Sequence, residues 1–518
     1  MDTDTELLEA KRKIEKQASQ IAGLTALVER YKELLRLSQR KLFGASSEKT
    51  IITGQVSLFN SETREAPSPE PEIEEVVVKR KKRRGKREKD LADLPTEVID
   101  YELPENERAC PECGDAMRDI GYDSRREIKY IPAQFVVVEH RQHKYACGRC
   151  YKETGTTPIV RQDAPPALIS GSLVSASLMA HIMNQKYALA LPLYRQEKEF
   201  LRMGVNLNRQ NMAYWTVYCA LNYLSIIRER LIARLLAENI LGADETVVQV
   251  LHEDEKSARS KSYEWVYRTG GCAEHPIVVY DYQPSREYKH PLNFLKGFKG
   301  YLHTDGYDAY HKLPDVTVVG CWAHARRKFD EALTALPPEN REDSEAAKGV
   351  AFCSKLFALE RHFSGMSPEE RYKQRLEQSK PISDALFSWA ENFRGAIPKN
   401  KLVEAAEYLL GQRPYLENVY LDGRLEFSNN RTERSVKPFV MGRKNWLFSN
   451  TPDGAQASSI IYTIVETAAE NGLKPYEYLK YLFERLPSAK TSEVEGLLPW
   501  NADLPAVCRM DISRRELA

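Results

Sequence analysis

The sequence has no long apolar run. Its 518 residues contain no stretch of about 18 uninterrupted apolar residues, so a transmembrane helix is excluded. The first residues, MDTDTELLEAKRKIEK, are charged throughout and lack the apolar core of a secretory signal. Cysteine is scarce, since nine residues are too few for a disulfide scaffold at this length. We therefore expect a cytoplasmic protein whose cysteines stay in a reducing compartment.

Net charge is almost absent as well, because 75 basic and 74 acidic residues leave a balance of +1. The two signs are nevertheless segregated. An acidic, Pro-containing stretch at residues 65–75 precedes KRKKRRGKREK at residues 79–89. Few large apolar residues occur between 45 and 94, which predicts a disordered linker. The basic run has two interpretations, a solvated tether or a contact to nucleic-acid phosphates.

A seven-residue apolar repeat marks the N-terminal 44 residues. Its members are Leu7, Ile14, Ile21, Val28, Leu35 and Leu42. A repeat kept over five heptads predicts a coiled coil, and hence a homodimer or higher oligomer. The alternative is a single amphipathic helix that docks on its own protein.

Four of the cysteines form two Cys-x-x-Cys pairs, Cys110 with Cys113 and Cys147 with Cys150. Two such pairs supply four thiolates to one tetrahedral site with no open position, so we expect structural Zn²⁺ in a module at residues 95–165. The spacing of His140 and His143 is also compatible with metal ligands, which leaves a mixed site open.

Residues 166–240 have helical patterns, with breaks at Pro192 and Gly204. Two short helices, a Gly-containing turn and a third helix resemble a DNA-binding helix-turn-helix, although a plain helical bundle gives the same pattern. The candidate DNA contacts in this block are Arg195, Arg202 and Arg209.

The clearest chemistry begins after residue 240. The expected strands are 242–251, 262–270, 275–282, a strand ending at Asp305, and 316–320, followed by a helix at 321–333. This order predicts a ribonuclease-H-like α/β core in which Asp244 and Asp305 lie side by side. Two close carboxylates favour divalent cations between them. Periodicity cannot decide between Asp244 and Glu245, or between Asp305 and Asp308.

Eight stretches in order along the chain resemble the insertion-sequence-66 family of bacterial DDE transposases. They are LFGASSEKT (42–50), the two Cys-x-x-Cys pairs, LPLYRQE (191–197), ADETVVQVL (243–251), HTDGYDAY (303–310), CWAHARRKF (321–329), NNRTERSVKP (429–438) and GRKNWLF (442–448). The resemblance implies a catalytic triad of Asp244, Asp305 and Glu433 that holds two Mg²⁺ (or Mn²⁺) ions. We expect Pro438 to bend or end the helix that carries Glu433.

Further side chains are candidates for positioning the site or binding DNA. Asn429 and Lys437 flank Glu433 at i−4 and i+4, although Glu433 and Lys437 also fit a surface ion pair. For His324, in Cys321-x-x-His324, a supporting role, a core role and a metal ligand are all open. The remaining candidates are Arg326, Arg327, Arg443, Lys444 and Trp446, and Trp446 also fits a core position.

The expected fold is therefore a multidomain α/β protein with added helical parts. Its predicted divisions are a coiled coil (1–44), a linker (45–94), the zinc module (95–165), a helical DNA-binding block (166–240), the first part of the core (241–335), a helical insertion (336–420), the second part of the core (421–470) and a helical C-terminal segment (471–518). We expect the tail beyond residue 487 to be poorly ordered.

These features predict a cytoplasmic, nucleoid-associated DNA transposase that binds element ends and target DNA. Accessory proteins of the same element are possible partners by resemblance. The rivals are a DNA-binding regulator with an inactive nuclease-like core and a structure-specific nuclease that performs no strand transfer.

Overall fold

The computed structural model describes residues 134–146, 159–161, 164–254, 256–396 and 400–510. The chain divides into two units, residues 1–126 and 127–518, and all described residues belong to the second. The predicted coiled coil, the linker with its basic run, and Cys110, Cys113, Cys147 and Cys150 lie outside the described residues. His140 and His143 are described and lie exposed.

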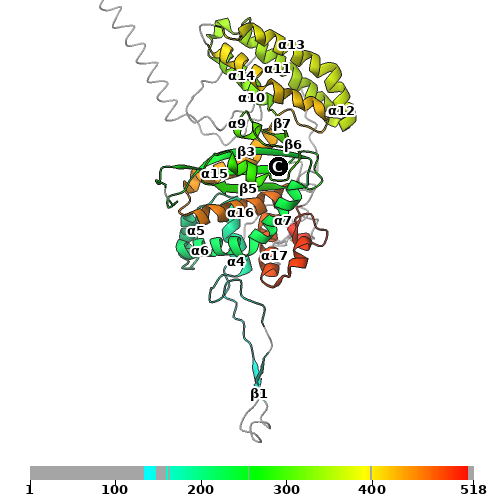
Figure 1. The fold of residues 1–518 in the computed structure, drawn as a ribbon. Coiled ribbons are helices and arrows are strands. Elements are labelled where there is room, and N and C mark those ends of the chain that lie inside the picture. Colours follow the sequence, from blue (N-terminus) through cyan, green and yellow to red (C-terminus); the bar gives the residue numbers. More distant parts are fainter. Residues whose placement is uncertain (1–133, 147–158, 162–163, 255, 397–399, 511–518) are drawn as a thin grey trace, which may run out of the picture. The chain divides into compact units, whose positions relative to one another are not determined.

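A five-stranded sheet forms the centre of the described part (Figure 1). Its spatial order is β5-β4-β3-β6-β7, in which the first three strands are antiparallel and β3, β6 and β7 are parallel. The strands are β3 (Ile240–Gln249), β4 (Lys261–Thr269), β5 (Val278–Gln283), β6 (Gly300–His303) and β7 (Val316–Val319). The chain is thus of mixed α/β class, and β6 ends two residues before Asp305.

Both faces of the sheet are covered. On one face, Tyr267 of β4 stacks on Phe294 of α8 (Lys289–Phe294), and Trp265 packs edge-on against Tyr310 of α9 (Asp308–His311). The other face carries α15 (Asn430–Trp446) and α16 (Pro452–Glu470) (Figure 1). This double coverage explains why β4 is a nearly continuous buried run.

Helix α16 also protects the open edge of the sheet. Thr463 and Thr467 accept hydrogen bonds from the backbone N–H groups of Tyr280 and Val278 on β5, at 2.9 and 3.1 Å. Strand edges with unpaired backbone groups invite pairing with other chains. The two threonine hydroxyls satisfy these groups from within the molecule.

The helical block before the sheet contains three helical stretches where the sequence predicts them. Ser175 and Asn208 cap the first and third stretches by accepting N–H groups of the first turn. Gly204, at φ +84°, makes the turn after the second. The elements are α4 (Ala176–Met183) with the π-helical turn η2 (Asn184–Ala188), α5 (Leu193–Arg202), and α6 (Arg209–Cys219) joined through η3 (Ala220–Leu224) to α7 (Ser225–Leu236).

A second hydrophobic core lies beyond the sheet, centred on Trp322, Phe329, Leu356, Phe387 and Leu409. It is built by α10 (Trp322–Thr334), α11 (Glu345–His362), α13 (Lys380–Ala390) and α14 (Lys401–Leu416), and α12 (Pro368–Gln374) accompanies them. These helices fill most of the segment for which the sequence predicts an insertion.

The structure differs from what the sequence predicts at two places. Of the two effects expected of Pro438, helix α15 does not end there but continues to Trp446, because a proline removes only one backbone donor and the buried Phe439 and Val440 hold the next turn in the core. The tail beyond 487 is ordered as far as residue 510. Leu498 and Cys508 are fully buried there, and Cys508 accepts a hydrogen bond from the backbone of Lys474, just before α17 (Pro475–Arg485).

Within the described ranges, every helix is too short or too polar to span a lipid bilayer.

Candidate active site

The sheet register places Asp244 beside Asp305. Strands β3 and β6 run parallel, and Gly242 pairs with His303. Each aspartate lies two residues after its member of this pair, so Asp305, just past the end of β6, lies level with Asp244 on β3. The backbone N–H of Tyr307 donates to Oδ1 of Asp305 at 3.0 Å and orients its carboxylate.

Helix α15 brings Glu433 to the same place. The first turn of α15 lies directly on β3, where a side chain at Gly242 would collide with Oγ1 of Thr432. The buried Asn429, just before the helix, donates from Nδ2 to the carbonyl of Ala243 at 3.0 Å. These contacts join the start of the helix to the two strand residues that directly precede Asp244.

The negative charges of Asp305 and Glu433 both act on the Asp244 carboxyl. The pKa of Asp244 is raised well above its ordinary value, first by burial and then by the negative charges of Glu245, Asp305 and Glu433. Crowded carboxylates of this kind are stable as anions when divalent cations lie between them. Carboxylate oxygens are donors that suit hard divalent cations.

The side chains of Asp244 and the adjacent Glu245 have different surroundings. The Glu245 side chain is 2% exposed, and both of its oxygens are engaged, by Arg286 and by the hydroxyl of Tyr310. Asp308 is 83% exposed on its side chain and faces His311. Glu426, another acid before α15, pairs with Arg431 at 2.8 Å. Glu245 and Glu426 are thus paired with arginine side chains, and Asp308 is largely exposed to solvent.

Cys321 and His324 lie beside Glu433. One ligand atom from each of these three residues lies within 4.8 Å of the other two. Nδ1 of His324 is 3.8 Å from Oε1 of Glu433, and both atoms are buried without a hydrogen-bond partner among the described residues. Burial lowers the pKa of His324, but Cys321 and Glu433 outweigh this effect and raise it to about 9. The His324 ring thus faces the Glu433 carboxylate.

The predicted cationic side chains occupy different surroundings. Arg443 is half-buried, and its Nη1 lies 3.5 Å from Oγ1 of Thr246, on the same face of β3 as Asp244. Lys437 and Arg327 are half-buried, whereas Arg326 and Lys444 are exposed.

The aromatic side chain of Trp446 packs into the core. It lies edge-on against Phe439 at 5.5 Å between ring centroids. This packing favours the core interpretation of Trp446 over base stacking.

Sequence reasoning missed the contribution of α14 to the site. A side chain at Gly306, next to Asp305, would approach Tyr408 and Gln412 of α14 at 3.1 Å. The pKa of Tyr408 is raised by burial and then by Cys321 and Asp305. No spacing signal could connect residues 408 and 305, because only tertiary packing brings them together.

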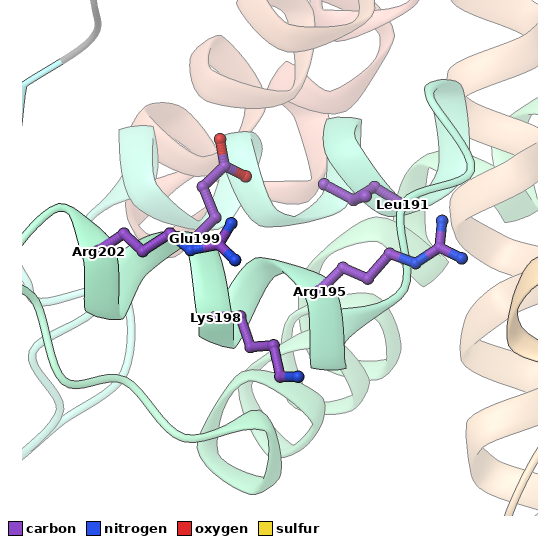
Figure 2. A pocket seen from close by; sticks show the side chains of 5 residues that line it. All are labelled: Leu191, Arg195, Lys198, Glu199 and Arg202. Carbon is purple, nitrogen blue, oxygen red and sulfur yellow. The ribbon is translucent and has the colours of Figure 1, made fainter.

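A separate hollow lies along α5, and Figure 2 shows its lining side chains. They are Leu191, Arg195, Lys198, Glu199 and Arg202. Arg195, Lys198 and Arg202 are exposed and share one face of the helix. The ring of Tyr194 lies below Lys198 at 4.5 Å and below Arg209 at 5.5 Å. The result is a basic and aromatic surface in the helical block.

Comparison with known proteins gives four family matches in succession along the chain. The largest, to the "Transposase IS66 family", covers residues 171–457. The others are the "zinc-finger binding domain of transposase IS66" (107–151), the "IS66 C-terminal element" (463–500) and "Transposase C of IS166 homeodomain" (30–99). The zinc-finger match includes all four cysteines of the two Cys-x-x-Cys pairs.

Similar proteins occur in Sinorhizobium fredii (strain NBRC 101917 / NGR234). "Uncharacterized protein y4qI" is 30% identical over 512 residues, which cover 94% of this chain and 90% of the relative. "Uncharacterized protein y4hP" is 25% identical over 511 residues, covering 94% and 87%. Because the largest family match spans more than half of the sequence and contains Asp244, Asp305 and Glu433, the chain belongs to the IS66 family of insertion-sequence transposases.

Proposed function

We propose that Asp244, Asp305 and Glu433 are the catalytic residues of this transposase and hold two Mg²⁺ ions. The observation that carries the proposal is the contact of the first turn of α15 with β3, which brings Glu433 into the electrostatic surroundings of Asp244. The sheet order, with three antiparallel strands followed by two parallel ones, supports a ribonuclease-H-like core.

The proposed reaction has two phosphoryl-transfer steps. Water first hydrolyses a phosphodiester bond at the element end and frees a 3′-hydroxyl. This hydroxyl then attacks a phosphodiester of the target DNA, whose P–O3′ bond breaks and whose 3′-oxygen leaves as a hydroxyl. Bound Mg²⁺ supplies activation of the attacking oxygen and stabilisation of the leaving oxygen. The protein itself orients the carboxylates, through Tyr307 at Asp305 and through Asn429 at the start of α15.

Two groups of residues support this chemistry. His324 positions Glu433, since Nδ1 of its ring faces Oε1 of the carboxylate at 3.8 Å. Arg443 and Lys437, on the same helix as Glu433, are placed to contact DNA phosphates next to the cleaved bond. In the proposed assembly, Cys110, Cys113, Cys147 and Cys150 bind structural Zn²⁺, and the N-terminal heptads pair the subunits.

Strand transfer separates this function from a nuclease that stops at hydrolysis. We expect the purified protein to join a pre-cleaved element end to a target plasmid in Mg²⁺. Asp305→Asn should give no joined product, because the site loses one of its charged ligands. Gel analysis of labelled ends measures the product. Cleavage without joining would support a nuclease, and DNA binding without either reaction would support a regulator.

The basic face of α5 is the proposed contact to the DNA backbone. Replacing Arg195, Lys198 and Arg202 by glutamine should weaken binding to duplexes of any sequence. The slope of log K against log salt should fall by about 0.9 for each phosphate that the variant no longer neutralises. Fluorescence anisotropy over a salt series measures it, and Lys480→Gln with Arg485→Gln on α17 is the matched control. An unchanged slope would remove α5 from the DNA interface.

A further inference from the structure

Asp305 lies just past the end of β6, one residue after the last backbone hydrogen bond to β7, from Thr304 N–H to the carbonyl of Val319 at 3.1 Å. Strand β6 ends at His303, so no β-ladder pairing extends to Asp305. Asp244, by contrast, lies inside β3 and is paired with Val266 of β4. A metal ligand needs a fixed orientation, and outer contacts commonly provide it. The contacts around Asp305 lead to a group of residues with no assigned role.

The group begins at a buried carboxylate on the other face of β3. Oε1 of Glu245 accepts hydrogen bonds from Nε of Arg286, at 2.7 Å, and from Nη2 of the same side chain. Oε2 accepts from the hydroxyl of Tyr310 at 2.6 Å. The Glu245 side chain is 2% exposed, and both of its carboxylate oxygens accept hydrogen bonds, one from two N–H groups of the Arg286 guanidinium and the other from a phenol. Glu245 therefore fixes the position of Arg286.

Arg286 in turn holds Tyr307 from two sides. Its guanidinium lies over the ring of Tyr307, with 3.7 Å between the guanidinium carbon and the ring centroid. The Tyr307 hydroxyl donates to the backbone carbonyl of Arg286. A guanidinium stacked on an aromatic ring and paired with a carboxylate has little freedom to move. Tyr307 is thereby fixed relative to β3.

Tyr307 completes the path to the catalytic site. Its backbone N–H donates to Oδ1 of Asp305 at 3.0 Å, so that one oxygen of this carboxylate has a fixed donor. Arg286 also lies within electrostatic reach of both Glu245 and Asp305, so one cation offsets two neighbouring anions. The path contains no residue of the triad except Asp305.

We propose that Glu245, Arg286, Tyr307 and Tyr310 form a clamp that orients Asp305 for metal binding, with Arg286 as the central positioning residue. The clamp rests on the proposed function, because it assumes that Asp305 is a metal ligand. It assigns to Glu245 a role different from that of Asp244, its neighbour in sequence. The clamp residues do not touch the metal or the DNA phosphate in this proposal.

The test is Mn²⁺ binding by the full-length protein, measured from the EPR signal of free Mn²⁺. Arg286→Met should raise the Kd of the Asp305-dependent site about 10- to 100-fold, the range typical of outer contacts to metal ligands. Arg286→Lys should recover part of the loss, because it keeps the charge but not the paired hydrogen bonds. In the cleavage assay, the half-saturating Mg²⁺ concentration should rise while the KM for DNA stays the same.

Arg228→Met is the matched control. Arg228 makes a comparable part-buried ion pair with Asp281 of β5, at 2.8 Å, and takes no part in the clamp. Its loss should lower stability without changing Mn²⁺ affinity. An equal change in affinity for both variants would show a general effect of destabilisation and overturn the clamp.

Two more variants distinguish a failure of the clamp from a failure of the proposed function. Tyr307→Phe removes only the hydroxyl, so it tests the same path if Arg286→Met does not fold, and we expect a smaller rise in the same Kd. Asp305→Asn tests the ligand itself. If Asp305→Asn binds Mn²⁺ and cleaves DNA normally, the proposed function fails. If Asp305→Asn is inactive while folded Arg286→Met and Tyr307→Phe have wild-type affinity, only the clamp fails.

Discussion

Glu433→Gln is expected to abolish DNA cleavage while the protein remains folded. The Glu433 side chain is 17% exposed, and no described residue makes a hydrogen bond to its Oε1 that would hold the helix in place. Glutamine has nearly the same shape but removes the charge that a divalent cation requires. Metal ions supply several kcal/mol of transition-state stabilisation, so the rate should fall by about 10³-fold or more. Single-turnover cleavage of an oligonucleotide containing the element end measures the loss.

Glu426→Gln is the matched control for this experiment. Glu426 precedes α15 and pairs with Arg431, so it is a nearby acid with a structural explanation of its own. We expect its variant to keep most of the cleavage rate. The opposite pattern, an inactive Glu426→Gln beside an active Glu433→Gln, would assign the third ligand to Glu426 and refute the triad.

The second large effect is expected at Arg375, which joins the helical insertion to the segment before α15. Its side chain is 1% exposed and makes two hydrogen bonds to Glu360, at 2.8 and 2.7 Å. The same guanidinium donates to the backbone carbonyls of Val419, Asp422 and Leu425. Arg375→Met would leave a mostly buried carboxylate and these carbonyls without their donor.

Loss of one partner of a buried ion pair typically costs about 3–5 kcal/mol. We expect Arg375→Met to lower the free energy of unfolding by that amount in urea titrations followed by circular dichroism. Arg394→Met is the control, since Arg394 pairs with Glu391 on the surface and exposed pairs contribute about 1 kcal/mol or less. Equal urea midpoints of unfolding for the two variants would show that the hydrogen bonds of Arg375 contribute no more stability than a surface ion pair.

Local patterns were sufficient for the strands and for most helices. Short apolar stretches between turn residues indicate β3 to β7, and the breaks at Pro192 and Gly204 separate the helices of the first block. These features depend on neighbours in sequence, so a sequence alone contains the information. Glu433 is different, since its part in the site was an inference from family resemblance and not from spacing.

Other features depend on contacts between distant residues and were not predictable. Asp244 and Glu245 are equivalent in a strand pattern, and only Arg286 and Tyr310 show that Glu245 is engaged on the other face. Tyr408 reaches the Asp305 loop from α14, a helix far away in the sequence. The tail beyond 487 contains few periodic residues, yet Leu498 and Cys508 fit the surface left by α17 and order it.

The most direct test of the central claim is the position of Mn²⁺ in crystals of the protein with an element-end DNA, located by anomalous scattering. We expect Mn²⁺ within coordination distance of the carboxylate oxygens of Asp244 and Asp305, with Glu433 as a further ligand. The peaks should disappear in Asp305→Asn. Mn²⁺ bound at Glu245 or Glu426, or no peak near Asp244 in a complex that cleaves its DNA, would contradict it.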